Sequence, residues 1–203
     1  MAIQQYALLG SVAYLLGSIP VALIVTGLLR RGDLRSIGSG NLGIYNTLFN
    51  VGKFPALVTI AANAMIGATA VVLARLFFPS DPVALFTAIV AVTTGSMWQI
   101  FVGFRGSRGT TVFGWAMVFS EPVMSFTLLG AWLSLVVICR RTRTATLASY
   151  VLMPVIFGVM GWSWAYVVGG AVLAFVLLLK SSLTPDDTNE LGLFRRFRIN
   201  VER

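Results

Sequence analysis

The residues best suited to chemistry lie in a glycine-rich segment, 38–43, which reads Gly-Ser-Gly-Asn-Leu-Gly. Glycines let successive backbone N–H groups converge on an anion, and Arg35 adds a permanent positive charge nearby. Ser39, Asn41 and Asn46 add neutral hydrogen-bonding side chains. The letters also match a dinucleotide-binding fingerprint, but that motif needs a preceding strand, and here a long apolar segment precedes it. The segment therefore indicates a phosphate site, with a glycine-rich turn beside basic residues as the simpler alternative.

Two later segments repeat this theme. Residues 103–109 read Gly-Phe-Arg-Gly-Ser-Arg-Gly, and arginines between glycines suit phosphate oxygens. In the third segment Arg143, Thr146 and Ser149 are spaced by three residues, so on a helix the two hydroxyls share a face. Such hydroxyls also bond their own backbone or a neighbouring helix, which is the alternative. The predicted phosphate-binding residues are Arg35, Gly38, Gly40, Gly43, Arg105, Gly106, Arg108, Gly109, Arg143, Thr146 and Ser149.

The composition excludes several classes of protein. The chain has 203 residues, of which 57% are hydrophobic and 11% charged. Soluble domains carry about 25% charged residues, so a soluble enzyme is excluded. Without histidine and with the single cysteine Cys139, the chain has no Ser-His triad, disulfide framework or thiolate metal cage. We expect no cofactor and no metal site, and we attribute the net charge of +8 to membrane orientation rather than nucleic-acid binding.

Stretches without charged residues predict the elements that position these segments. They are 1–29, 54–74, 82–104, 109–120, 122–139 and 144–179. A helix of about 20 residues crosses the hydrocarbon layer, so four stretches fit one span each and the last fits two. The stretch 109–120 predicts a short or re-entrant span. We therefore predict an all-α integral membrane protein with about seven transmembrane helices, one of them short.

The basic residues predict the orientation. With the N-terminus outside and seven crossings, every Lys and Arg except Arg75 falls on the cytoplasmic side, as membrane proteins prefer. The C-terminus is then cytoplasmic. We divide the chain into a polytopic membrane domain, 1–180, and a basic cytoplasmic tail, 181–203. The tail is interpreted as an anchor on anionic lipid, with a docking segment for a partner as the alternative.

The motifs resemble those of the acyl-phosphate:glycerol-3-phosphate acyltransferases, which are integral enzymes of the bacterial inner membrane. The resemblance rests on residues 17–20, 33–46 and 103–109 and covers roughly residues 10–150. It implies a seven-span fold that transfers an acyl group from acyl-phosphate to glycerol 3-phosphate and yields lysophosphatidic acid. If the protein is active, the resemblance implies catalytic roles for Ser39, Asn41 and Asn46.

The sequence departs from the family pattern at several positions. Ser96 stands where the family has a histidine, and Phe49 where it has an arginine. Asn63 and Ile66 replace an acidic residue and a lysine in the second span, and the family's C-terminal motif is not recognisable in 180–203. A general base contributes roughly 10²–10⁴ in rate. These losses favour a catalytically silent relative, retained as a transmembrane subunit or as a lipid- or phosphate-binding component of a membrane complex.

Two alternatives stand beside the silent relative. An active acyltransferase is one, because acyl-phosphate is already activated and a substrate phosphate can accept the proton. A transporter or channel is the other, although it needs ionisable residues at the bilayer midplane, which the predicted spans lack. The expected partners are membrane lipids, acyl-phosphate and glycerol 3-phosphate, with protein partners for a silent subunit and no nucleic acid.

Overall fold

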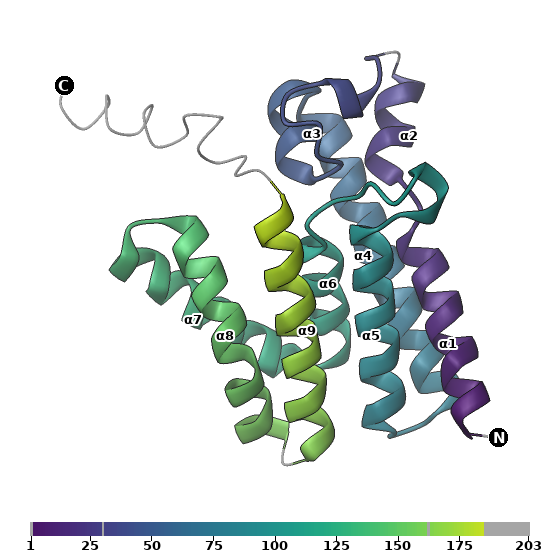
Figure 1. The fold of residues 1–203 in the computed structure, drawn as a ribbon, viewed down its shortest axis with the longest axis vertical. Helices are drawn as coiled ribbons and strands as arrows, with labels where there is room; N and C mark the ends of the chain where they lie inside the picture. The colour runs from purple at the N-terminus through teal and green to yellow at the C-terminus, as the bar shows by residue number, and fades with distance from the viewer. Residues whose placement is uncertain (1, 30, 162, 185–203) are drawn as a thin grey trace.

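The computed structural model describes residues 2–29, 31–161 and 163–184, which form helices and connecting loops without a strand. Figure 1 shows their arrangement. The α-helices are α1 (Ala2–Gly17), α2 (Val21–Leu28), α3 (Ile44–Asn50), α4 (Lys53–Phe77), α5 (Pro82–Met97), α6 (Thr110–Ser120), α7 (Pro122–Cys139), α8 (Thr142–Gly161) and α9 (Trp164–Leu183). Two short 3₁₀ helices, η1 (Leu34–Ser36) and η2 (Ile100–Val102), lie in the loops.

Six helical segments of the described chain are long and apolar enough to cross a membrane, and α6 is a shorter apolar helix. This confirms the all-α membrane fold, and helices occupy most of each predicted stretch. The first segment is broken between α1 and α2 because Pro20 lacks an N–H group and disfavours a helical Ile19. The number of crossings and their direction stay predictions. The boundary expected at 180/181 falls inside α9, and the tail from 185 onward lies outside the described residues.

Helix α5 is the centre of the bundle. It packs against α1, α4, α6 and α9, and 56% of its most apolar stretch is buried, against 11% for α7. The crossing with α1 is close because glycines face backbone on both sides. A Cβ on Gly17 would lie 2.0 Å from the Val92 carbonyl oxygen, and one on Gly95 2.2 Å from that of Tyr14. The C-terminal end of α5, which the second loop follows, is therefore held tightly against α1.

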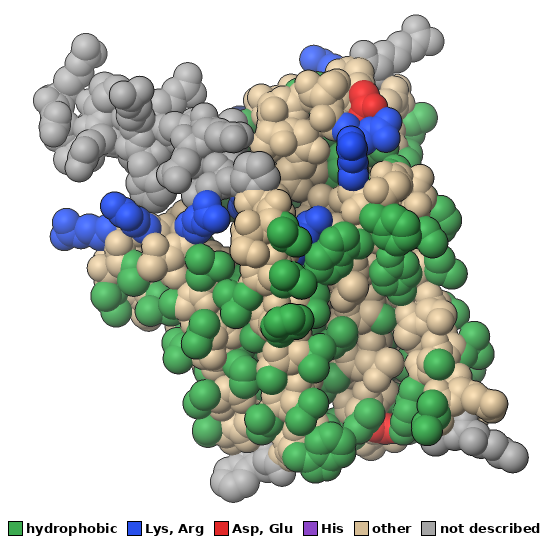
Figure 2. Space-filling model, viewed as in Figure 1, with side chains coloured by type: hydrophobic (Ala, Val, Ile, Leu, Met, Phe, Trp, Pro, Cys, Tyr) green, Lys and Arg blue, Asp and Glu red, His purple; other side chains and the backbone are tan. Residues whose placement is uncertain are grey.

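The two ends of the bundle differ in charge. Residues 31–52 and 98–109 lie at the upper end in Figure 1, which we call the motif end, whereas the N-terminus lies at the opposite end. Most of the basic side chains visible in Figure 2 gather at or near the motif end. Helix α9 ends towards the motif end, whereas α1 begins at the opposite end.

Candidate functional site

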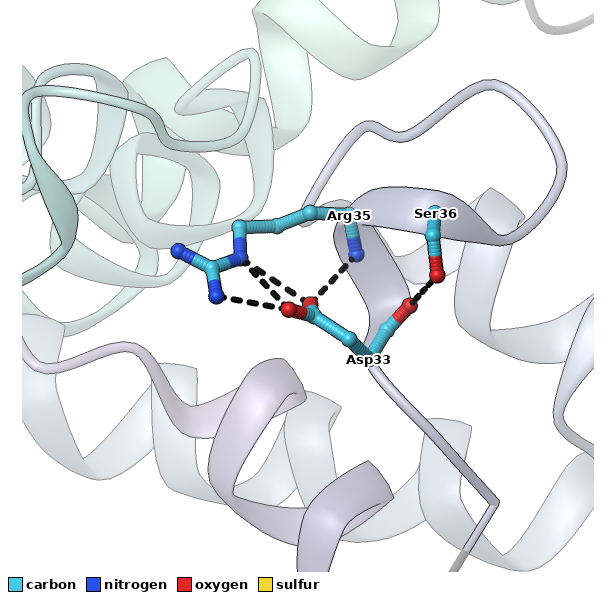
Figure 3. A network of polar contacts seen from close by, with 3 residues as sticks. All are labelled: Asp33, Arg35 and Ser36. Carbon is cyan, nitrogen blue, oxygen red and sulfur yellow. Dashed lines mark hydrogen bonds and ion pairs between the residues drawn. The ribbon is translucent and has the colours of Figure 1, made fainter.

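The first loop, 31–43, is organised by an ion pair between Asp33 and Arg35 (Figure 3). The Asp33 carboxylate accepts the backbone N–H of Arg35 at 2.9 Å and so begins η1. It also accepts from the Arg35 guanidinium, with Nη2 at 2.6 Å and Nε at 3.0 Å. The hydrogen bonds from the Arg35 side chain and backbone lower the pKa of Asp33 to about 2. Arg35, predicted to bind phosphate, is therefore already held by a carboxylate of its own loop.

Asn46, near the start of α3, is hydrogen-bonded to the backbone of this loop. Its side chain is 1% exposed, and Nδ2 donates to the carbonyl oxygens of Ile37 at 2.9 Å and Asn41 at 3.0 Å. Its Oδ1 accepts from Asn50 at 2.8 Å. Gly38, with φ of 58°, lies against this pair of amides, where a Cβ would be 2.3 Å from Asn46 Oδ1. The predicted catalytic Asn46 thus has the contacts of a residue that shapes the loop.

Ser39 and Asn41 flank the left-handed Gly40, whose φ is 68°. Ser39 Oγ accepts the backbone N–H of Asn41 at 3.4 Å, and the Gly40 N–H donates to the Ile37 carbonyl at 3.1 Å. Part of the predicted cluster of anion-binding amides is therefore used inside the loop. Gly43 is extended and begins α3 instead of forming a left-handed turn. Of the two neighbours of Gly40, Ser39 is half-buried and Asn41 is buried.

The second loop, 103–109, lies directly on the C-terminal end of α5. A Cβ on Gly106 would be 2.4 Å from the Ser96 carbonyl oxygen and 2.6 Å from that of Met97, so any side chain there would displace the loop from α5. The Ser107 N–H donates to the Ser96 carbonyl at 2.9 Å, and Ser107 Oγ accepts from the Gly109 N–H at 3.0 Å. Ser107 therefore closes the turn before α6.

The N-terminus of α6 adds hydrogen-bond donors to this loop. Gly109 precedes the helix with φ of 76° and provides no side-chain cap. The first N–H groups of a helix have no acceptor within it, and they favour anions. Arg105 is exposed and Arg108 half-buried in the preceding turn. The predicted residues Arg105, Gly106, Arg108 and Gly109 are thus close in chain and in space.

The structure brings the first and second loops together. Val102 of η2 packs against a small apolar cluster that contains Leu34 and Leu42 of the first loop, with Ala22 of α2 and Val51. On the other side, Ser18 Oγ lies 3.4 Å from the Gly95 carbonyl oxygen, which ties the end of α1 to the end of α5. Two basic glycine-rich loops therefore share one end of the bundle.

The third predicted segment contributes differently. Thr146 Oγ1 donates to the Thr142 carbonyl at 2.8 Å and accepts from Trp132 Nε1 at 2.9 Å. Ser149 Oγ donates to the Ala145 carbonyl at 2.7 Å and is buried. Both hydroxyls therefore have the helix-packing contacts that were the alternative to phosphate binding. Arg143 borders a largely apolar hollow of about 430 Å³ between α8 and α9.

Several polar residues near the loops were not predicted. Tyr150, next to Ser149, forms a hydrogen bond with Thr110 at the start of α6. Lys180, interpreted before as an orientation charge, lies with Nζ 5.1 Å from the centroid of the Trp98 ring at the end of α5. The Trp98 carbonyl in turn accepts from the Tyr14 hydroxyl. Patterns along the chain carry no signal for these pairs, because their members are 40 to 84 residues apart.

Two buried side-chain oxygens of α5 and its C-terminal end have no hydrogen-bond partner among the described residues and are not explained by packing. They are Thr93 Oγ1 and Gln99 Oε1, on side chains that are 0% and 5% exposed. Buried polar atoms are nearly always bonded, so these two oxygens are positions to test for contact with a ligand or water. Thr93 lies under the second loop, where its Cγ2 is 3.3 Å from the position of a Cβ on Gly109.

The residues that depart from the family pattern also have defined surroundings. Ser96 Oγ donates to the Thr93 carbonyl at 2.7 Å, so its proton is committed to its own helix. Ile66 is buried in the core, and Phe49 is exposed and stacks on Tyr45 with ring centroids 6.4 Å apart. Within the described residues no three His, Cys, Asp or Glu side chains gather in a way that could hold a metal ion.

The family model and the relatives that match this chain carry the same description. A family model described as glycerol-3-phosphate acyltransferase matches residues 7–183. The glycerol-3-phosphate acyltransferase of Gluconobacter oxydans is 37% identical over 74% of this chain and 72% of its own. Glycerol-3-phosphate acyltransferase 2 of Moorella thermoacetica is 33% identical over 77% of this chain and 79% of its own.

The fold has a counterpart among solved structures. The crystal structure of PlsY, an integral membrane glycerol 3-phosphate acyltransferase, in its glycerol 3-phosphate form, superposes with a TM-score of 0.76. The match covers 94% of this chain and 92% of that one at 22% identity. At this level of identity the likeness is one of fold.

Proposed function

The chain belongs to the glycerol-3-phosphate acyltransferase family, and from that premise we propose that it is an active enzyme of the bacterial inner membrane. It would transfer an acyl group from acyl-phosphate to glycerol 3-phosphate and yield lysophosphatidic acid. The relatives are named as enzymes, which favours this alternative over a silent subunit of a complex. Neither catalytic silence nor a protein partner is indicated by these relatives.

The observation that carries the proposal is that Val102, directly before the second loop, packs against the apolar cluster that contains Leu34 and Leu42 of the first loop. Each substrate carries a phosphate, and each loop combines glycines with arginine. We assign Arg35, Gly38 and Gly43 to one phosphate, with Gly40 shaping the turn between them, and Arg105, Gly106, Arg108 and Gly109 to the other. Guanidinium and backbone N–H groups are the usual phosphate ligands, and together they lower the charge repulsion between two anionic substrates.

The reaction needs little beyond positioning. The 1-hydroxyl oxygen of glycerol 3-phosphate attacks the acyl carbonyl carbon, the bond from that carbon to the phosphate oxygen breaks, and inorganic phosphate leaves. The hydroxyl proton goes to the leaving phosphate. The mixed anhydride is already activated, so holding the two reactants in line supplies most of the rate gain.

We assign the proton to the leaving phosphate because the carboxylate in the first loop, Asp33, is paired with Arg35 and has a pKa lowered to about 2, which makes it a weak base. It has no histidine, and the Ser96 hydroxyl is bonded to the Thr93 carbonyl. We therefore assign Ser39 and Asn41 as hydrogen-bond partners of the reacting groups and Asn46 as the residue that positions them. Arg143, beside the apolar hollow, is assigned to the phosphate of the lipid substrate, whereas Thr146 and Ser149 stabilise α8.

The decisive experiment measures acyl transfer from palmitoyl-phosphate to labelled glycerol 3-phosphate by purified protein in nanodiscs. We expect turnover that falls below detection in Ser39→Ala and in Arg108→Gln. Ser134→Ala is the matched control, because that hydroxyl bonds the Gly130 carbonyl on α7 and is exposed away from the loops. Folded wild-type protein without turnover, beside an active family member, would overturn the proposal and restore the silent relative.

A further inference from the structure

A hydrogen bond joins the second loop to the third segment. The hydroxyl oxygens of Thr110, the first residue of α6, and Tyr150 of α8 lie 3.1 Å apart. Each residue directly follows one assigned to phosphate binding in the sequence analysis, Gly109 and Ser149. The family resemblance gave no role to either hydroxyl. This contact is therefore a candidate part of the site that the motifs do not describe.

The two hydroxyls differ in their surroundings. Tyr150 is 4% exposed and packs in the main hydrophobic core, whereas Thr110 is exposed at the motif end. Arg108, two residues before Thr110, lies close enough to interact electrostatically with the Tyr150 hydroxyl. A buried tyrosine hydroxyl needs a partner, and here Thr110 Oγ1 is that partner.

One hydrogen bond between two hydroxyls uses one of their two hydrogens. The other hydrogen must find a different acceptor. Since Tyr150 is enclosed and Thr110 is exposed, the arrangement that satisfies both has the Tyr150 hydroxyl donating outward to Thr110 Oγ1. The Thr110 hydrogen then points out towards the loop end. A hydroxyl that accepts one hydrogen bond donates a stronger second one.

We propose that Thr110 Oγ1 donates a hydrogen bond to a phosphate oxygen of the substrate held beside Arg108, and that the buried Tyr150 orients and polarises it. This rests on the proposed function for the identity of the substrate. Thr110 contacts the ligand, and Tyr150 is a positioning residue that acts through it. The chemistry recognised is a phosphate group, either that of a substrate or inorganic phosphate as product.

The test compares Thr110→Val, Thr110→Ser, Tyr150→Phe and the double variant Thr110→Val/Tyr150→Phe. The measurements are KM and kcat for each substrate, the inhibition constant of inorganic phosphate, and the melting temperature with and without phosphate. Loss of one donor to an anion predicts an inhibition constant about 10-fold higher in Thr110→Val. Tyr150→Phe should give about a 3-fold increase, the double variant no more than Thr110→Val, and Thr110→Ser a value near wild type.

Tyr166→Phe is the matched control. Its hydroxyl donates to Glu121 Oε1 at 2.8 Å and also joins two helices, but at the opposite end of the bundle. This variant should lower the melting temperature without changing phosphate inhibition. If Thr110→Val and Tyr150→Phe behave in the same way, the hydrogen bond only joins helices and the inference is overturned.

The two proposals fail separately. If the wild type shows no turnover but phosphate raises its melting temperature and that of Thr110→Ser, and not that of Thr110→Val, the acyltransferase proposal falls and the phosphate contact stands. If the wild type is active and Thr110→Val keeps its KM values and its phosphate inhibition, the inference falls and the enzyme stands. Absence of both turnover and phosphate stabilisation overturns both.

Discussion

Asp33 accepts hydrogen bonds from both the backbone N–H and the guanidinium of Arg35, so the charge of this arginine is paired before any substrate arrives. The two residues are exposed to similar extents, with side chains that are 42% and 41% exposed, and an exposed ion pair of this kind exchanges readily with another anion. A substrate phosphate at the first loop therefore competes with a carboxylate for the same guanidinium. Asp33 both shapes the loop and weakens its attraction for anions.

Asp33→Asn separates these two effects. Asparagine retains an oxygen that can begin η1, but it removes the negative charge. We expect the inhibition constant of inorganic phosphate to fall about 3-fold at low ionic strength, and the gain to disappear near 0.5 M salt because of screening. Arg35→Gln should shift it in the opposite direction. Weaker phosphate inhibition in Asp33→Asn would instead show that ordering of the loop is the larger effect.

The same pair sets an acid limit for the loop. The pKa of Asp33 is lowered from 3.8 to about 2 in the fold, so its contribution to stability is complete above the unfolded value and is lost as the pH falls towards about 2. The difference in melting temperature between wild type and Asp33→Asn should therefore be constant from pH 8 to about pH 5 and vanish between about pH 4 and pH 2. A difference that changes near neutral pH would contradict the assignment.

Gly106 is the position where the second loop tolerates least change. In Gly106→Ala the new Cβ would meet two carbonyl oxygens at 2.4 and 2.6 Å, so the loop must move away from α5. Overpacking of this kind costs about 1–3 kcal/mol, and displacement of Arg105 and Arg108 should lower kcat/KM by about 10-fold or more. Activity assays and thermal unfolding in detergent measure both effects.

Gly114→Ala is the control for that substitution. Gly114 lies in the middle of α6, and a Cβ there meets no atom within 4 Å. Alanine should therefore stabilise the helix by about 0.5–1 kcal/mol and leave activity unchanged. If both variants behave alike, the contact between the second loop and α5 has no special importance.

Thr93 provides a test of the buried oxygen under the second loop. Thr93→Val has nearly the same shape and removes a hydroxyl oxygen that has no partner among the described residues. If the oxygen is simply unsatisfied, the variant should gain about 1 kcal/mol of stability and keep its activity. Thr94→Val is the neighbouring control, because that hydroxyl donates to the Val90 carbonyl at 2.7 Å. A stable Thr93→Val protein with raised KM would show that the hydroxyl binds substrate.

The fold was predictable from the sequence to the extent that it depends on apolar length and charge. Uncharged stretches set the long helices, and the glycines at 38, 40, 103 and 109 do adopt the left-handed backbone that such turns need. Helix α3 was not predicted, because a helix of seven residues is too short to show a helical period in the sequence. The break at Pro20 also escaped prediction, since it lies within one continuous apolar stretch.

The site was predictable at the level of loops and not at the level of side-chain roles. Asn46 was expected among the catalytic residues, yet its contacts hold the loop, and Thr146 and Ser149 bond their own helix. Spacing along the chain does not reveal which hydroxyl faces a neighbouring helix. The pair of Thr110 and Tyr150 depends on how α6 and α8 pack, which is a long-range property.

The orientation can be tested with the single cysteine of the chain. Cys139 is half-buried at the end of α7, beside the cluster of basic residues predicted to be cytoplasmic. A membrane-impermeant thiol reagent should label it in inside-out vesicles and not in intact spheroplasts, since basic loops are retained in the cytoplasm. In the variant Cys139→Ala/Ser80→Cys the pattern should be reversed, because Ser80 is exposed in the turn between α4 and α5. Labelling of Cys139 from the outside would invert the predicted topology and put both glycine-rich loops away from the cytoplasmic pool of glycerol 3-phosphate.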